Sequence, residues 1–216
     1  KLSEFVYNSA FMMKPIFAQA KTAPKRIAYA EGEDLRVLRA VQIAVDEGLA
    51  FPILVGRTAV IEANIKKLGL RLEHGVNIEI VDQEKNPHYE QFADDYYQTM
   101  QRKGVTPEYA HREARRRSTL IAAMLVKHGH ADGMLCGTYS SYDIHLDFVK
   151  NVIGLKEGRS TFFTLNALML QDRNLFIADT YVNTNPTAEQ LAEMTILAAE
   201  EVRRFGVTPR IALLSH

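Results

Sequence analysis

A strand, a helix and a second strand follow one another between residues 26 and 56, and this order constrains the fold more than any other feature of the sequence. Residues 26–30 and 51–56 are short apolar runs typical of strands. Residues 35–47 lie between them and place Leu38, Val41 and Val45 on one face of a helix. Two strands joined by a helix pair in parallel, with a right-handed crossover. The sequence therefore predicts an α/β fold with a mostly parallel sheet flanked by helices.

The alternation of strands and helices continues along the chain. We expect further strands at residues 77–81, 133–136, 175–178 and 211–214, and a strand or buried helix at 160–170. Further helices are expected at residues 58–68, 87–103, 107–129 and 141–152. After a lead-in helix and junction at residues 1–20, these elements form two subdomains, residues 21–140 and 141–216. Because the chain stops directly after a predicted buried strand, we expect the second subdomain to be incomplete at its C-terminal end.

The composition excludes several classes of function. Lysine and arginine together number 26, as do aspartate and glutamate, which argues against a nucleic-acid partner. Cys136 is the only cysteine, which fits a reducing, cytoplasmic location, and its predicted apolar strand favours a buried, inert thiol. No apolar run approaches the ~20 residues that span a bilayer, so we expect no membrane partner. The histidines show no metal-ligand spacing, and no glycine-rich phosphate loop is present.

Polar residues follow the predicted strands at 175–178 and 211–214. Open α/β sheets bind ligands beyond the carboxyl ends of their strands, so Asp179, Asn183 and Ser215 lie where a site is expected. The next helix has strong starting signals, with Asn185 as the cap, Pro186 in the first turn and Glu189 completing a capping box. A structural role explains Pro186 and Glu189, whereas Asp179 and Asn183 are equally open to a structural and a functional interpretation.

Charged residues gather at two further places. Residues 31–34 hold three carboxylates at a helix start, where the helix dipole favours them. Arg112, Arg115, Arg116 and Arg117 form the densest positive patch in the chain. Guanidinium groups bind phosphate and carboxylate well, so this patch suits a ligand phosphate or a subunit contact, although a solvated helix face is the default interpretation.

The residue patterns of several segments resemble those of a known family. Residues 178–192 read Ala-Asp-Thr-Tyr-Val-Asn-Thr-Asn-Pro-Thr-Ala-Glu-Gln-Leu-Ala and resemble the Ala-Asp-x-x-Val-Asn-Pro-x-Pro-Thr segment of the phosphate acetyltransferase family. Residues 30–34, 103–106, 131–134 and 153–154 also match that family. The resemblance implies transfer of an acetyl group between acetyl phosphate and coenzyme A. It also implies a two-subdomain fold like that of the isocitrate and isopropylmalate dehydrogenases, with the site in the interdomain cleft.

Some positions depart from the family pattern. The family usually carries an arginine where this chain has Asp147, and another where it has Met100. The strand-end loop 137–142 reads Gly-Thr-Tyr-Ser-Ser-Tyr in place of the usual Gly-Ala-x-His-Thr-Thr. These changes remove cations that phosphate transfer would use. With them, the chain most resembles the phosphate acetyltransferase-like C-terminal domain of bifunctional-type NADP-dependent malic enzymes.

This resemblance implies a non-catalytic regulatory domain that binds acetyl-CoA, mediates homo-oligomerisation and inhibits an attached malic enzyme. We expect no cofactor in this domain, and NADP with a divalent metal, Mg or Mn, in the malic enzyme domain of the same chain. The ligand-binding residues implied are Thr138, Tyr139, Ser140, Ser141, Asp179, Asn183, Ser215, Arg115 and Arg116. Two alternatives stay open. One is an active phosphate acetyltransferase in which Arg102 or Arg117 replaces the lost cations, and the other is an oligomerisation module with an empty cleft.

Overall fold

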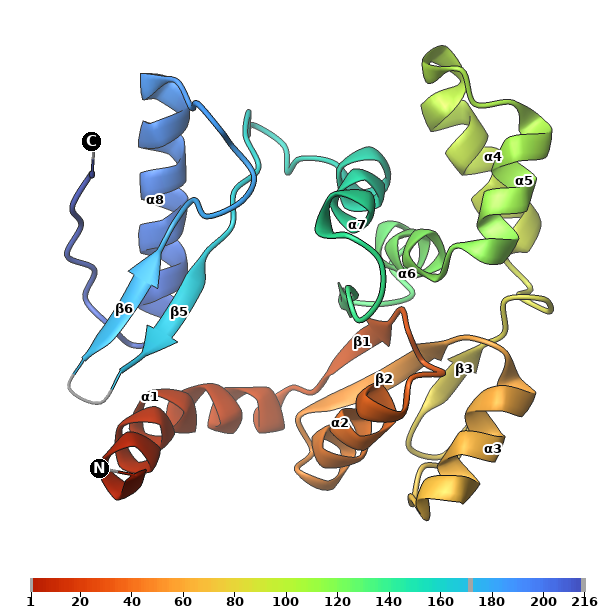
Figure 1. Ribbon diagram of the computed structural model, residues 1–216, viewed down its shortest axis with the longest axis horizontal. Helices are drawn as coiled ribbons and strands as arrows, with labels where there is room; N and C mark the ends of the chain where they lie inside the picture. Colours follow the sequence, from red (N-terminus) through yellow and green to blue (C-terminus); the bar gives the residue numbers. More distant parts are fainter. Residues whose placement is uncertain (1, 171–172, 215–216) are drawn as a thin grey trace. The chain divides into compact units, whose positions relative to one another are not determined.

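The computed structural model describes residues 2–170 and 173–214, with side chains from residue 12 onward, and divides into two compact units. The larger unit is Ala20–Gly154, and the smaller unit combines Lys1–Gln19 with Leu155–His216 (Figure 1). Residues 141–154 therefore group with the larger unit, although the sequence assigned them to the second subdomain. Each unit is described by itself, so the interdomain cleft stays a prediction.

A parallel four-stranded sheet forms the centre of the larger unit, as the sequence predicted. Its strands are β1 (Lys25–Tyr29), β2 (Ala50–Val55), β3 (Glu79–Val81) and β4 (Gly133–Leu135). The spatial order is β3-β2-β1-β4, and every pairing is parallel. Strands β2 and β3 lie on one side of β1, and β4 pairs with β1 on the other side. The order therefore reverses between β1 and β4, the point at which open α/β sheets bind ligands.

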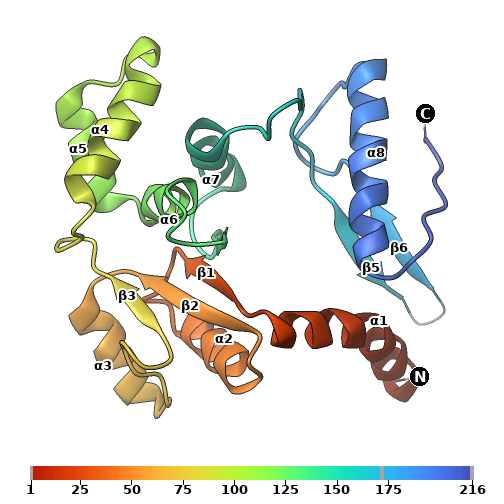
Figure 2. The same ribbon diagram turned by 180° about the vertical axis from the view of Figure 1, so that it is seen from behind.

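Helices cover both faces of this sheet (Figure 2). The helices α2 (Leu35–Asp46) and α3 (Thr58–Leu68) pack on one face, where Leu54 meets Leu38 and Ile61. On the other face lie α4 (Tyr89–Met100), α5 (Pro107–Arg116) and α6 (Ser118–Lys127), against Ile53 and Val55. Successive residues of β2 thus enter opposite cores, because side chains alternate along a strand and both faces of this sheet are covered.

The predicted single helix at 107–129 is wrong, because the chain breaks into α5 and α6 at Arg117. This residue is extended, with φ −99° and ψ 98°. Helix α5 is amphipathic, whereas residues 119–125 of α6 are all buried. One straight helix cannot suit both environments. The predicted helix at 87–103 also changes at its end, where a 3₁₀ turn, Gln101–Lys103, follows α4.

The end of the larger unit is helical, as predicted for residues 141–152. Helix α7 (Tyr142–Phe148) runs into a π-helical turn, Val149–Ile153. The expectation for Cys136 is wrong, since β4 stops at Leu135 and the side chain of Cys136 is exposed. Desolvation and the nearby Glu31 carboxylate nevertheless raise the pKa of its thiol to about 11. The thiol therefore stays protonated at neutral pH, which agrees with the predicted lack of reactivity.

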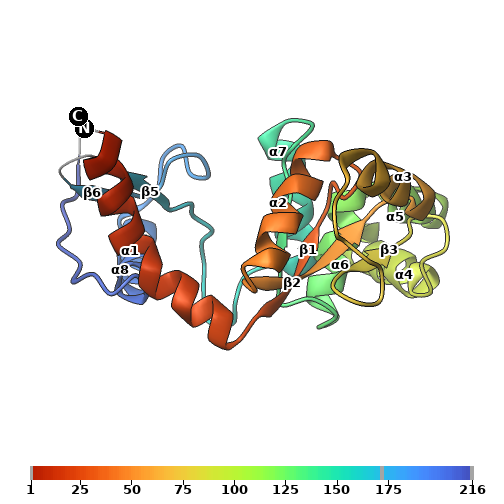
Figure 3. The same ribbon diagram turned by 90° about the horizontal axis from the view of Figure 1, so that it is seen from below.

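The smaller unit holds a two-stranded antiparallel sheet and two helices. Strand β5 (Asn166–Met169) pairs with β6 (Asn174–Ile177), and α8 (Ala188–Arg204) follows. The ring of Phe176 in β6 meets that of Phe205 at 5.2 Å between centroids, edge to face. Helix α1 (Leu2–Thr22) is one continuous element (Figure 3) and closely follows the lead-in helix and junction predicted at residues 1–20.

Two expectations for the smaller unit are wrong. Residues 211–214 form no strand, because none of the described strands pairs with them, and Leu214 is 93% exposed. Helix α8 starts later than predicted, since Thr187 is its cap and Gln190 completes the capping box in place of Asn185 and Glu189.

Among the helices described, none has both the length and the apolar character that a bilayer span requires.

Candidate functional site

A pocket of about 600 Å³ opens at the carboxyl end of the parallel sheet, and we call it the strand-end pocket. Its walls come from the loops after β1, β2, β3 and β4 and from the junction between α5 and α6. The lining residues used below are Glu31, Glu33, Asp34, Arg57, Arg115, Arg116 and Tyr139. The pocket therefore occupies the edge at which a ligand is expected in an open α/β sheet.

Asp34 links the loops after β1 and β4. Its carboxylate caps α2 by accepting from the backbone N of Arg36 and Val37 at 2.7 and 3.3 Å. It also accepts Nε and Nη2 of Arg36 at 3.1 and 3.0 Å, and the hydroxyl of Tyr139 donates to its Oδ2. The Arg36 hydrogen bonds lower the pKa of Asp34 far below its usual range despite desolvation. Asp34 is therefore a permanent anion that joins the two loops on either side of the strand-order reversal.

Glu33 and Arg57 form a second charged pair in the same pocket. Glu33 accepts the backbone N, Nε and Nη2 of Arg57 at 2.8, 2.9 and 2.7 Å. These hydrogen bonds lower the pKa of Glu33, and they engage the Arg57 guanidinium in a bidentate pair. Gly56 makes room for the pair, because a Cβ there would lie 2.8 Å from Cγ of Glu33.

Two arginines of the last turn of α5 line the strand-end pocket, as the sequence suggested for a ligand phosphate. The Arg115 guanidinium lies over the ring of Tyr89, 4.3 Å from its centroid. Arg116 makes none of the ion pairs or hydrogen bonds found in the described part of the chain. Arg116 is therefore a cation of this pocket that an anionic ligand can meet without displacing another group.

His145 positions the strand-end loop, a role that sequence reasoning missed. Its Nε2 bonds the carbonyl oxygen of Tyr139, and its Nδ1 lies 2.8 Å from Oγ1 of Thr119. Because a carbonyl only accepts, Nε2 carries the proton, and Nδ1 of the neutral ring accepts from the threonine. Gly137 fixes the start of the loop by donating its N–H to Glu31 at 2.9 Å. The pairing of His145 with Tyr139 depends on tertiary structure, so no local sequence signal reveals it.

The other candidates of the loop after β4 are less closely grouped. Ser140 lines a separate pocket of about 480 Å³ with Cys136 and His145. Ser141 is the N-cap residue of α7, although its side chain makes no capping hydrogen bond, and Thr138 is half-buried. Of the four predicted loop residues, Tyr139 is the one that lines the strand-end pocket with Arg115 and Arg116.

Asp179 and Asn183 belong to the smaller unit, where they hold their own loop together. Asp179 accepts the backbone N and hydroxyl of Thr164 at 2.9 and 2.8 Å, and the backbone N and Nδ2 of Asn183 at 2.7 and 2.6 Å. Desolvation alone would raise its pKa, but these hydrogen bonds lower it to about 2. The structural interpretation thus explains both residues, and their contact with a ligand stays a prediction. Ser215 lies outside the described residues.

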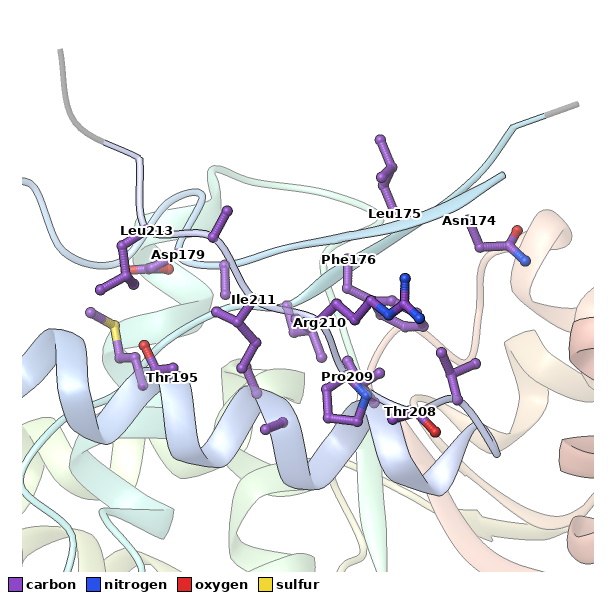
Figure 4. Close-up of a pocket in the computed structure, with 18 of the residues that line it drawn as sticks. Asn174, Leu175, Phe176, Asp179, Thr195, Thr208, Pro209, Arg210, Ile211 and Leu213 are labelled. Carbon is purple, nitrogen blue, oxygen red and sulfur yellow. The ribbon is translucent and has the colours of Figure 1, made fainter. Parts of the chain in front are cut away.

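A second, mostly apolar pocket of about 450 Å³ lies in the smaller unit. Figure 4 shows Phe176 of β6, Thr195 of α8 and Ile211 of the following segment among its lining residues. Among the predicted site residues that the structure describes, Asp179 is the one that lines it. With few charged groups, this pocket suits an apolar group rather than a phosphate.

The two positions where the resemblance led us to expect arginine hold no cation. Met100 is 8% exposed and belongs to the core that α4, α5 and α6 form on one face of the sheet. Asp147 is exposed on α7 and brings a negative charge. Within the described residues, no group of three histidine, cysteine, aspartate or glutamate side chains could hold a metal ion.

Comparison with known proteins identifies the family. The family model for phosphate acetyl/butaryl transferase matches residues 11–216. The chain belongs to this family. Its fold agrees with a phosphotransacetylase from Streptococcus pyogenes, with a TM-score of 0.83 and 26% identity over 94% of this chain and 62% of that one. The predicted α/β architecture with a parallel sheet is thus confirmed.

Within the phosphate acetyl/butaryl transferase family, the chain is more similar to several malic enzymes, at 46% to 53% identity, than to two phosphate acetyltransferases, at 34% and 32%. It is 52% identical over its whole length to the NADP-dependent malic enzyme of Haemophilus influenzae, and 53% to that of Escherichia coli. Identity to the phosphate acetyltransferase of Nitratidesulfovibrio vulgaris is 34% over 93% of the chain. The chain spans 29%, 28% and 28% of these three relatives, respectively, and matches the C-terminal part of the malic enzymes.

Proposed function

We propose that this chain is a non-catalytic regulatory domain that binds acetyl-CoA and allosterically inhibits an attached malic enzyme. That enzyme would convert malate and NADP to pyruvate, CO2 and NADPH. The observation that carries the proposal is the 52% identity to a malic enzyme over the whole chain, against 34% to a phosphate acetyltransferase. A domain retained next to a dehydrogenase, with an altered set of charges in its site, is suited to sensing a ligand.

The charges of the strand-end pocket support binding over phosphate transfer. Arg36 and Arg57 are paired with Asp34 and Glu33, so they are poorly placed to stabilise the charge of a reacting phosphate. Met100 and Asp147 supply no replacement. A unit charge pair at 4 Å is worth about 4 kcal/mol at an effective dielectric of ~20, so this loss is large for catalysis. Arg116 remains as a contact for a phosphate of acetyl-CoA.

The rest of the proposal concerns partners. The domain itself needs no cofactor, whereas the attached malic enzyme uses NADP and Mg or Mn. We propose a cytoplasmic homo-oligomer assembled through this domain, with neither nucleic acid nor membrane as a partner. The proposed ligand contacts are Tyr139, Arg115 and Arg116 in the strand-end pocket. Thr138, Ser140, Ser141, Asp179, Asn183 and Ser215 are proposed as further contacts.

The test is a calorimetric titration of acetyl-CoA into the full-length protein in phosphate buffer, with malate oxidation followed in parallel. Saturating heats without released CoA, together with slower malate oxidation, are the expected result. If acetyl-CoA lowers the affinity for the dehydrogenase ligands, these ligands must weaken acetyl-CoA binding by the same factor, because binding coupling is reciprocal. Absence of both binding and inhibition would rule out the proposal.

An active phosphate acetyltransferase is the second candidate, and the 34% identity to such an enzyme favours it. Arg117 is poorly available for this chemistry, because its Nε donates to Oε2 of Glu113 at 2.9 Å. The same titration separates the two functions, since turnover releases free CoA thiol continuously. A third outcome is that acetyl-CoA neither binds nor inhibits malate oxidation, while removal of the domain abolishes oligomer assembly. The domain would then be an oligomerisation module.

A further inference from the structure

Three histidines and a phenylalanine form a closed ring of stacked side chains outside the strand-end pocket. His88 stacks on Phe92 and His130, with ring centroids 5.7 and 4.3 Å apart. His128 stacks on the same two rings, with centroids 5.3 Å from Phe92 and 6.4 Å from His130. We call these four residues the histidine cluster. None of them lines the strand-end pocket, and nothing in the proposed function uses them.

The histidine cluster joins two helices at their ends. His88 precedes the first residue of α4, and the buried Phe92 follows one turn later, its backbone N donating to the carbonyl oxygen of His88 at 2.9 Å. His128 follows the last residue of α6, and the backbone N of His130 donates to the carbonyl oxygen of Leu125 at 2.8 Å. The four rings therefore hold the start of α4 against the end of α6.

One of the three imidazoles has a carboxylate beside it. Nε2 of His128 lies 2.7 Å from Oδ2 of Asp95, and its Nδ1 lies 3.4 Å from Nε2 of Gln91. Asp95 can therefore balance a positive charge on His128. His88 and His130, in contrast, form no ion pair within the described part of the chain. A proton added to either of these two rings thus brings a charge that no paired carboxylate balances.

The other charged and titratable groups beside His88 and His130 supply no net negative charge. The groups that line the same cavity as these two rings are Arg26, His74, Glu79, Asp82 and Lys85. Two of them are carboxylates and two are cations, and Arg26 pairs with Glu79 at 2.7 Å. Desolvation, and next the neighbouring histidines and Arg26, lower the pKa of His130, while Glu79 opposes them in part.

The neutral form of the histidine cluster is the one that stabilises the fold. The pKa of His130 is lower in the folded chain than the ordinary ~6.5 of histidine. Its contribution to stability is therefore fully present above about pH 6.5 and is lost as the pH falls through the lowered pKa. If His88 also takes up a proton, two positive rings lie 4.3 Å apart and repel each other.

From the ring geometry and the missing counter-charges, we propose that the histidine cluster is a pH-sensitive switch that holds the start of α4 against the end of α6 at neutral pH and releases it in mildly acidic solution. Histidine is the side chain whose charge changes in this range. The segment that leads into α4 also contributes Gln83 and Glu84 to the strand-end pocket. Release of α4 therefore loosens one wall of that pocket.

The test is hydrogen–deuterium exchange of the full-length protein at about pH 7.5 and about pH 5.5, with each rate corrected for the intrinsic pH dependence of amide exchange. In peptides that cover residues 88–95, protection should fall about tenfold or more in acid. Peptides from α2, which packs on the opposite face of the sheet, should keep their protection within about twofold.

A variant without one titratable ring assigns the effect to the histidine cluster. His130→Phe keeps a flat ring but cannot take up a proton, so the acid-induced loss of protection should shrink to about threefold or less. His111→Gln is the control, because it removes a titratable ring that contacts Tyr89 at the start of α4 but lies outside the cluster. This control should keep the full loss.

Two results would overturn the proposal. One is a wild-type protein in which residues 88–95 are equally protected at both pH values, or lose protection together with α2. The other is a full acid-induced loss in His130→Phe. Should His130→Phe fail to fold by circular dichroism, His88→Gln decides the question in the same way. The exchange experiment uses no ligand, so its outcome is independent of the proposed binding of acetyl-CoA.

Discussion

At the scale of single residues, two carboxylate–arginine pairs organise the strand-end pocket. Asp34 joins Arg36 and Tyr139, and Glu33 joins Arg57. Each carboxylate also accepts backbone N–H groups, so charge and loop conformation are fixed together. Residues that hold a binding loop in this way limit the reorganisation needed when a ligand arrives.

Replacing Asp34 should measure this organisation. Asp34→Ala removes the cap of α2 and the acceptor of the Tyr139 hydroxyl, and should lower the free energy of unfolding by about 1 to 2 kcal/mol. Tyr139→Phe keeps the cap and should lower it less. Urea unfolding measures both, with Tyr109→Phe as the control, because the Tyr109 ring contact with Arg112 needs no hydroxyl. Equal stability of Asp34→Ala and wild type would contradict the assigned role.

The low pKa of Asp179 predicts an acid-sensitive loop in the smaller unit. Its pKa is about 2 in the folded chain, below the usual ~3.9 of aspartate, so the ionised form stabilises the fold. This contribution, about 1 to 2 kcal/mol, is fully present above pH ~4 and is lost as the pH falls through about 2. The stability difference between wild type and Asp179→Asn should therefore shrink across that interval. Asp94→Asn, at an exposed site, should show no such trend.

At the scale of elements, local rules explain where most helices and strands lie, and tertiary packing decides their ends. Alternating apolar runs were enough to predict β1, α2, β2 and their parallel pairing. The break at Arg117 was not predicted, because it depends on α6 being buried on every side. The hydrogen bond between Tyr139 and Asp34 spans 105 positions and follows from the adjacency of β1 and β4. No local pattern encodes that adjacency.

The start of α8 provides a test of capping. Thr187 accepts the backbone N of Gln190, while Gln190 accepts the backbone N of Thr187. Thr187→Ala should therefore lower the free energy of unfolding by about 1 kcal/mol. The sequence favoured Asn185 as the cap, so Asn185→Ala is the matched control and should change stability by a few tenths of a kcal/mol at most. A larger loss of stability in Asn185→Ala than in Thr187→Ala, measured by urea unfolding, would instead identify Asn185 as the cap.

At the scale of the whole molecule, a phosphate acetyl/butaryl transferase fold holds Met100 and Asp147 at the two positions where the family resemblance led us to expect arginine. The family and the α/β architecture could be inferred from the sequence, as several matching segments pointed to them. The hydrogen bonds of individual site residues could not. Asp179 and Asn183 bind one another, and Asp179 binds Thr164, which the sequence did not reveal, and their contact with a ligand stays a prediction.

Arg116 provides a test of the proposed function in the complete protein. Arg116→Ala should weaken acetyl-CoA binding about tenfold, since a charge-assisted contact to phosphate is lost. The concentration of acetyl-CoA that half-inhibits malate oxidation should rise by the same factor. Arg39→Ala removes an exposed arginine of α2 that is not among the residues lining the pocket and should change neither quantity. Matching effects of both variants would point to a general charge effect.

The most direct test of the central claim is acetyl-CoA binding by the full-length protein in phosphate buffer, with free CoA thiol and malate oxidation followed in the same sample. We predict saturable binding, no release of CoA, and inhibition that follows occupancy. Continuous release of CoA would contradict this account and make the domain an active acetyltransferase. Binding that leaves malate oxidation unchanged would equally contradict a regulatory role.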